Sequence, residues 1–243
     1  MAERGLAVAV TGMHRSGTSL VAQLLSLCGV FIGEPEELEP ANEYNPEGHF
    51  EHLEFVRLNE EILAVLGGRW EIPPTGALLW QRFRLASFRE RARDLAQRMA
   101  PRAPWGWKDP RTCLTLPLWL KVVPELRIVS VVRPADAVAR SLEARAGATR
   151  EFSLSLWAEY NTRLLRAAPR RRTIVTSYDA YFESPEHELE RIVRFLGLPA
   201  SSQTIAEASA AANPAHRHHR GGGGELPPDV ARLERRLFAL AAK

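Results

Sequence analysis

Lysine is scarce in this sequence. Only Lys108, Lys121 and Lys243 among its 32 basic residues are lysines, so arginine is the ordinary cation and a lysine at a structured position is informative. Long hydrophobic runs are also missing, since no apolar stretch approaches the roughly 20 residues of a membrane-spanning helix. The first ten residues, MAERGLAVAV, lack a signal-peptide cleavage pattern. These absences predict a cytoplasmic protein without a membrane span.

Cysteine is equally rare. Cys28 and Cys113 both lie in apolar segments, which predicts reduced thiols in the core rather than a disulfide framework. The net charge at pH 7 is only +3, whereas a protein that binds nucleic acid usually concentrates much more positive charge. The sequence therefore predicts no nucleic-acid partner, and it carries no signal for a particular oligomeric state.

What the sequence does contain is the composition of a globular protein. It has 243 residues, of which 45% are hydrophobic and 25% are charged. This length fits one α/β domain, residues 1–243, with a full hydrophobic core. Short apolar runs without alternation predict buried parallel strands. The predicted strands are 6–11, 105–108, 126–132 and 173–176.

Helices are predicted where apolar residues recur at helical spacing. The predicted ranges are 20–28, 53–66, 85–99, 137–142, 152–168, 189–196 and 230–240. Residues 33–52 form a long segment without a clear period, which is typical of a functional or disordered loop. Residues 213–228 are rich in Pro, His, Arg and Gly and predict a flexible basic segment. Its three histidines are His216, His218 and His219. No Cys or carboxylate lies near them at ligand spacing, so no metal site is predicted.

A phosphate-binding loop is the most specific motif. GMHRSGTSL, residues 12–20, follows a predicted strand and has two glycines separated by four residues, then two hydroxyls. Such a strand–loop–helix directs backbone N–H groups at an anion. The lysine of a nucleoside triphosphatase is missing, because Thr18 stands in its place, and Arg15 lies inside the loop instead. A tight turn without a ligand is the alternative, but it leaves this many-part match unexplained.

A second cation stands where a triphosphatase would hold magnesium. The most apolar strand, 126–132, ends at Arg133 rather than at an Asp. Ser141 lies eight residues further on, which lets a following helix bring both side chains to the carboxyl edge of the sheet, where ligands bind. Taken singly, Arg133 fits a surface ion pair, and Ser141 fits a hydroxyl bonded to its own helix. Together with the loop they predict an anion site with two halves in a P-loop-type three-layer sandwich, a central parallel sheet flanked by helices.

These residues resemble the sulfotransferases that use 3′-phosphoadenosine 5′-phosphosulfate (PAPS) and release 3′-phosphoadenosine 5′-phosphate (PAP). The likeness runs from about residue 6 to 199 through RSGTSL, RPADAVARS and TSYDAYFESPEHELERIVRFLGLP. It is strongest to bacterial members that carry NPxGxxE and KDPR, here NPEGHFE and KDPR. Asp179 and Ala180 depart from the family's Glu and Asp after the tyrosine.

The resemblance implies nucleotide-binding roles for the loop, for the Arg and Ser eight residues apart, and for a tyrosine beside the adenine. These residues are Arg15, Ser16, Gly17, Thr18, Ser19, Leu20, Arg133, Ser141 and Tyr178. The segment HRHHRG is a looser match to the basic segment that closes over the nucleotide, and it adds Arg217 and Arg220.

The absence of a lysine from the loop is also compatible with sulfuryl transfer. The transferred group carries less charge than a phosphoryl group, so fixed cations and N–H donors can replace a metal ion. Lys108, at the end of a predicted strand, is the candidate cation for the leaving group, and Arg15 is the candidate for the phosphosulfate. Lys108 could instead be an ordinary surface lysine, but the rarity of lysine in this sequence argues against that.

A general base must lie near the acceptor's hydroxyl. Glu51 is favoured because it lies between Gly48 and the start of a predicted helix, and His49 is second because its ordinary pKa suits neutral pH. Asp109 is the minority choice. In KDPR, Asp109 and Arg111 are interpreted mainly as orienting partners that pair with each other.

The leading hypothesis is therefore a metal-free, PAPS-dependent sulfotransferase that acts on a hydroxyl of a small molecule, a glycan or a glycopeptide. The second is a magnesium-dependent P-loop kinase of a small metabolite, which needs the missing lysine's role from elsewhere in the chain. The third is a non-catalytic nucleotide-binding protein, which would bind PAP but have no activity to lose when Glu51 and Lys108 are replaced.

Overall fold

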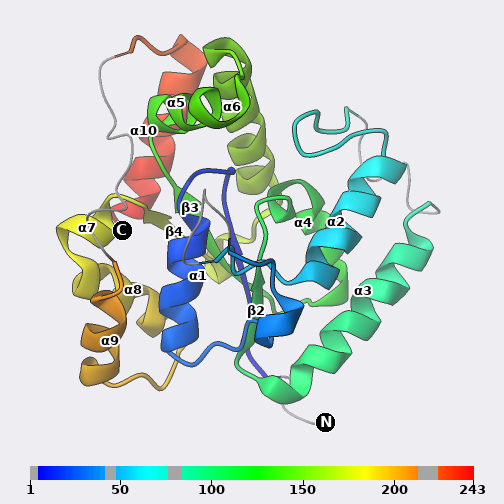
Figure 1. Ribbon diagram of the computed structural model, residues 1–243, viewed down its shortest axis with the longest axis vertical. Helices are drawn as coiled ribbons and strands as arrows, with labels where there is room; N and C mark the ends of the chain where they lie inside the picture. The colour runs from blue at the N-terminus through cyan, green and yellow to red at the C-terminus, as the bar shows by residue number, and fades with distance from the viewer. Residues whose placement is uncertain (1–4, 42–47, 76–83, 213–223) are drawn as a thin grey trace.

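A four-stranded parallel sheet forms the centre of the computed structural model, which describes residues 5–41, 48–75, 84–212 and 224–243 (Figure 1). The strand order is β2-β1-β3-β4. The strands are β1 Ala7–Thr11, β2 Trp105–Lys108, β3 Arg127–Val132 and β4 Thr173–Ser177. All four predicted strands are confirmed to within one residue at each end, and so is the α/β class with helices on both faces.

The two faces of β1 explain the two halves of the core. Ala7 and Ala9 pack into one hydrophobic cluster, and Val8 and Val10 pack into the other. Every residue of β1 is buried, as expected of a parallel strand covered on both faces. The strand therefore reads as a continuous apolar run rather than an alternating one.

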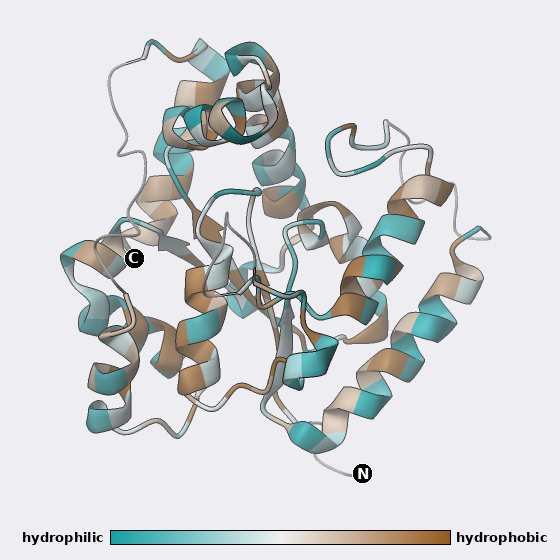
Figure 2. Ribbon diagram, in the orientation of Figure 1, coloured by the Kyte–Doolittle hydropathy of each residue, from teal (hydrophilic) through white to brown (hydrophobic). Residues whose placement is uncertain are grey.

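Helices form a layer on each face of the sheet. One layer contains α1 Thr18–Leu27, α7 Ala180–Glu183, α8 Pro185–Leu196 and α9 Ser202–Ser209. The other contains α2 Leu53–Val65, α3 Ala86–Met99, α4 Thr112–Val122, α5 Ala135–Ala146, α6 Arg150–Ala167 and α10 Pro228–Ala241. Short 3₁₀ turns lie at Pro35–Glu37, Ala100–Arg102 and Arg170–Arg172. Hydrophilic residues recur along α3, the amphipathic helix at the surface (Figure 2).

The seven predicted helices are all present, but the sequence missed α4, α7 and α9. Both cysteines are free, buried thiols, as predicted. Burial raises the pKa of Cys113 to about 12, so this thiol stays protonated. Within the described ranges, no helix is long and apolar enough to cross a bilayer.

Candidate active site

The carboxyl ends of the four strands carry most of the predicted site residues. Lys108 is the last residue of β2, Arg133 directly follows β3, and Tyr178 directly follows β4. The phosphate-binding loop, residues 12–17, joins β1 to α1. Because the strands are parallel, these ends meet at one edge of the sheet, which is where open α/β sheets bind ligands.

The phosphate-binding loop turns into α1 through left-handed backbone. Gly17 precedes the helix with φ 87°, and Arg15 also has a positive φ, 69°. A Cβ at Gly17 would lie 2.0 Å from Cδ2 of Tyr178. The loop therefore needs glycine for both its backbone conformation and its contact with the ring. The helix then starts with Thr18, Ser19 and Leu20, so the N–H groups of its first turn lie beside the loop, where a helix N-terminus favours an anion.

We expect Gly17→Ala to destabilise the protein by about 2–5 kcal/mol. Left-handed backbone accounts for about 1–2 kcal/mol, and overlap with the Tyr178 ring accounts for about 1–3 kcal/mol. Gly29→Ala is the matched control, because Gly29 has φ 95° but nothing lies within 4 Å of an added Cβ. Denaturant unfolding measures both free energies. Equal losses would mean that the ring of Tyr178 moves aside at no cost.

Two arginines and a serine from distant segments meet beside this loop. Arg15 Nε donates to Ser141 Oγ at 2.9 Å, and Arg133 Nη1 donates to the carbonyl oxygen of Arg15 at 3.0 Å. The guanidinium of Arg133 also lies 4.6 Å from the centre of the Tyr178 ring, a cation–π contact. The structure thus places the two halves of the predicted anion site side by side.

The chemistry of this cluster fits an anionic ligand. Burial, followed by the like charges of Arg145 and Arg133, lowers the pKa of Arg15, so the cluster holds repelling positive charges. Ser16 Oγ is buried and has no hydrogen-bond partner within the described residues. An anion would attract these cations and accept a hydrogen bond from this hydroxyl. A phosphate or phosphosulfate group supplies both interactions.

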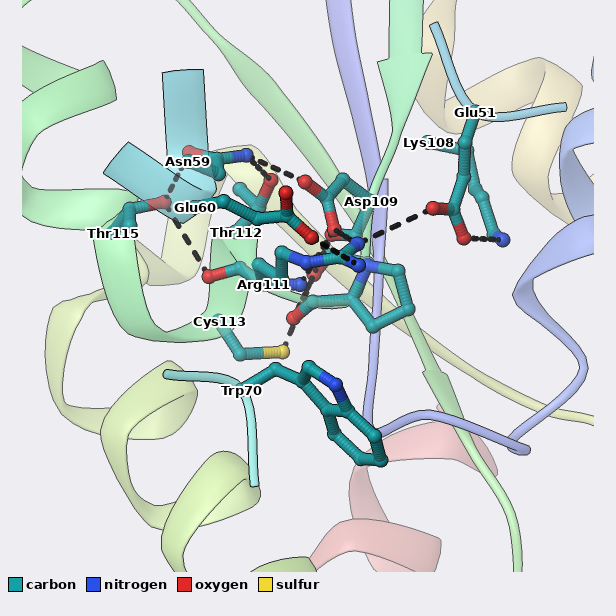
Figure 3. Close-up of polar contacts among 12 residues, drawn as sticks. Glu51, Asn59, Glu60, Trp70, Lys108, Asp109, Arg111, Thr112, Cys113 and Thr115 are labelled. Atoms are coloured by element: carbon teal, nitrogen blue, oxygen red, sulfur yellow. Dashed lines mark hydrogen bonds and ion pairs between the residues drawn. The ribbon is translucent and has the colours of Figure 1, made fainter. Parts of the chain in front are cut away.

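Glu51 and Lys108 form an ion pair at the other end of the site (Figure 3). Lys108 Nζ lies 2.5 Å from Glu51 Oε1, and Arg111 Nη1 lies 3.2 Å from Glu51 Oε2. Burial alone would raise the pKa of Glu51, but Lys108 and Arg111 lower it to about 2. Glu51 precedes α2, whose N-cap His52 accepts the backbone N–H of Glu54 at 3.3 Å. The carboxylate is therefore fixed in place and ionised at neutral pH.

A cavity of about 480 Å³ is lined by one residue from the arginine cluster and one from the ion pair. Arg15 and Glu51 both line it, and Trp70 and Leu142 contribute apolar walls. His49 lines it as well; burial and then Lys108 lower the pKa of this imidazole, which keeps it neutral at pH 7. The cavity is large enough for a small molecule or for one residue of a larger ligand.

Asp109 and Arg111 pair with each other, as predicted, with 3.1 Å between Asp109 Oδ1 and Arg111 Nη1. Asp109 is fully buried, and the residues described around the cavity do not include it. This placement favours an orienting role over a role as the base. Asn59, which donates to Asp109 Oδ2 at 2.7 Å, and His14, which lines the cavity, were missed by the sequence reasoning. His14 lies inside the loop motif, so a search of that motif for titratable groups would have found it.

Several predicted features lie outside the described residues. These are Arg217, Arg220, the three histidines near them, and most of the basic segment, of which only 224–228 is described. Across the described ranges, no cluster of three or more His, Cys, Asp or Glu side chains could hold a metal ion.

Sequence comparison identifies proteins that are similar to this chain. Residues 7–202 match a family model described as the sulfotransferase family. A Caenorhabditis elegans protein named "Putative protein-tyrosine sulfotransferase" is 31% identical over 108 residues, which cover 40% of this chain and 41% of that protein. A Caenorhabditis briggsae protein of the same name is 30% identical over 108 residues, covering 40% and 38%. The matched segment thus spans well under half of either relative.

Solved structures share the fold. The sulfotransferase domain from the curacin biosynthetic pathway superposes with a TM-score of 0.57 at 15% identity, covering 96% of this chain and 97% of that domain. The sulfotransferase STF1 of Mycobacterium tuberculosis gives a TM-score of 0.52 at 15% identity, covering 97% and 77%. The predicted P-loop-type arrangement is therefore confirmed at the level of the fold.

Proposed function

Because the chain belongs to the sulfotransferase family of enzymes, we propose that it transfers a sulfuryl group from PAPS to a hydroxyl of a small-molecule, glycan or glycopeptide acceptor. One observation carries this proposal. A basic cluster, formed by two arginines and a serine, lies at the same sheet edge as the ion pair of Glu51 and Lys108: Arg15, Arg133 and Ser141. Arg15 and Glu51 line one cavity. A sulfuryl donor bound at the basic cluster and an acceptor hydroxyl near Glu51 would meet in this cavity.

The chain's own residues would divide the work as follows. Arg133 and Ser141 would hold the 3′-phosphate, and Tyr178 would lie beside the adenine. The phosphate-binding loop and the first turn of α1 would hold the phosphosulfate through Arg15, Ser16, Gly17, Thr18, Ser19 and Leu20. PAPS, when bound, supplies the activated sulfuryl group and leaves as PAP. Lys108 provides fixed positive charge at the end of β2.

Glu51 is the proposed general base. Its two oxygens bind Lys108 and Arg111 but keep further lone pairs, so the carboxylate can accept the acceptor's hydroxyl proton. His49, a neutral imidazole in the same cavity, is the second candidate. Because the base and the cations are all side chains, no metal is part of the proposal. The single-domain organisation over 1–243 and the cytoplasmic location stay predictions.

Calorimetric titration with PAP and with ATP–Mg²⁺, each with and without EDTA, tests the proposal first. We expect PAP to bind tightly whether or not EDTA is present, and ATP not to bind. ATP binding that requires magnesium would favour the kinase hypothesis instead. Turnover of PAPS to PAP is then measured with a panel of phenols, sugars, glycopeptides and tyrosine peptides; the last follow the name of the worm relatives. PAP binding without turnover on any of them would favour the non-catalytic alternative.

A further inference from the structure

A buried asparagine anchors a chain of polar contacts behind Glu51. Asn59 lies on α2 and is fully buried. Thr115 Oγ1 and Trp119 Nε1, both on α4, donate to Asn59 Oδ1 at 2.7 and 2.9 Å. Two donors on one oxygen fix which way the amide points. Asn59 Nδ2 therefore donates to Asp109 Oδ2, 2.7 Å away (Figure 3).

Asp109 in turn fixes the position of Arg111 through hydrogen bonds. Asp109 Oδ1 accepts the backbone N–H of Arg111 at 2.8 Å and its Nη1 at 3.1 Å. The same Nη1 donates to Glu51 Oε2 at 3.2 Å, and Nη2 lies 3.0 Å from Glu60 Oε1. The guanidinium is thus held between a buried carboxylate and the carboxylate that faces the cavity. Figure 3 shows this series running from Asn59 to Lys108.

We propose that Asn59 is a positioning residue for Glu51: it fixes Asp109, and Asp109 fixes the Arg111 guanidinium that orients Glu51 in the cavity. This inference rests on the proposed function, because it takes Glu51 as the base. Asn59 and Asp109 are both fully buried, so they act through Arg111 rather than by touching an acceptor.

Protonation of Asp109 should shape the pH profile of turnover. Burial raises the pKa of Asp109 to about 6, while the hydrogen bond from Asn59 favours the ionised form and lowers it. As pH falls through about 6, Asp109 gains a proton and loses the charge that holds Arg111. We therefore expect turnover to fall there, although Glu51 itself stays ionised far below that pH.

The other groups around Asp109 titrate elsewhere or stay charged. Burial lowers the pKa of Arg111, but the nearby carboxylates together outweigh it and raise this pKa overall, so Arg111 keeps its charge. Burial raises the pKa values of Cys113 and Tyr160, so both stay neutral near pH 6. Burial lowers the pKa of His14, which faces Arg111, well below its ordinary value. Asp109 is therefore the group in this buried network whose charge changes near pH 6.

The test measures the titration of Asp109 and the pH profile of turnover in the same set of full-length proteins. Carbon-13 NMR of aspartate-labelled protein resolves a set of five side-chain carboxyl groups, and Asp109→Asn identifies the Asp109 signal by removing it. Asn59→Leu removes the donor to Asp109 and should raise its pKa by about one unit. Thr115→Val removes one of the two donors that orient Asn59, together with a 3.4 Å contact from Thr115 Oγ1 to the carbonyl oxygen of Arg111, and should give a smaller shift in the same direction.

Asn161→Leu is the matched control. Asn161 is also a buried asparagine, but its Nδ2 donates to the carbonyl oxygen of Trp157 at 2.8 Å and not to Asp109. We expect no shift of the Asp109 signal in this variant. A general loosening of the fold would affect both asparagine variants alike and would not move a single carboxyl titration.

The expected result is that the acid limb of turnover moves with the Asp109 signal, by about one unit in Asn59→Leu, while the Kd for PAP is unchanged. If Asn59→Leu does not fold, the same comparison in Thr115→Val decides. An Asp109 signal that does not move, or one that moves while the acid limb stays in place, would overturn the inference. Failure of the unsubstituted protein to bind PAP would instead overturn the proposed function, and this inference with it.

Discussion

Arg133→Ala should weaken PAP binding by about 10- to 100-fold, which corresponds to about 1.5–3 kcal/mol for hydrogen bonds to a charged group. Binding of adenosine 5′-phosphosulfate, which has no 3′-phosphate, should change much less. Arg133 is largely buried, lies over the Tyr178 ring and donates to the carbonyl oxygen of Arg15. Losing these contacts affects both nucleotides alike. The difference between the two losses therefore isolates the 3′-phosphate.

Calorimetry with both nucleotides on one preparation measures this difference. Arg140→Ala is the matched control, because it removes an equal charge from α5, where Arg140 pairs with Asp136 at 3.4 Å. We expect that control to bind both nucleotides almost normally. Equal losses of PAP and of adenosine 5′-phosphosulfate in Arg133→Ala would place Arg133 outside the 3′-phosphate site.

The strands were predicted to within one residue at each end, whereas α4 was missed. Strands β1 and β3 are short and mostly apolar, and burial on both faces removes the alternation that would suggest an exposed sheet. Helix α4 is also buried on most sides, so it shows no single apolar stripe, and Pro117 lies inside it. Periodicity cannot reveal a helix whose neighbours surround it.

Some contacts of the candidate site could likewise be predicted from the sequence, and others could not. The pairing of Asp109 with Arg111 was predictable because it forms within one turn of the chain. The pairing of Glu51 with Lys108 was not, since it joins residues 57 positions apart, and only the fold brings them together. Asn59 lies in between: it falls on the buried stripe of α2, and a polar residue there requires partners. The sequence contains that signal, but it does not show which partners are chosen.

The largest loss of turnover is expected for Glu51→Gln. A general base typically contributes about 10²- to 10⁴-fold to a rate, and a glutamine of similar shape cannot take up the acceptor's proton. PAP affinity should stay nearly normal, because the basic cluster around Arg15 remains intact. Steady-state turnover of PAPS and calorimetry with PAP separate these two effects.

Glu60→Gln is the matched control for this loss. Glu60 lines the same cavity and also binds Arg111, at 3.0 Å, but its side chain is 54% exposed. Glu60→Gln therefore removes one negative charge from the same cavity, and an exposed ion pair contributes little to stability. We expect turnover close to normal in this variant. A normal rate in Glu51→Gln as well would move the role of base to His49, whose low pKa already leaves it unprotonated in the same cavity at neutral pH.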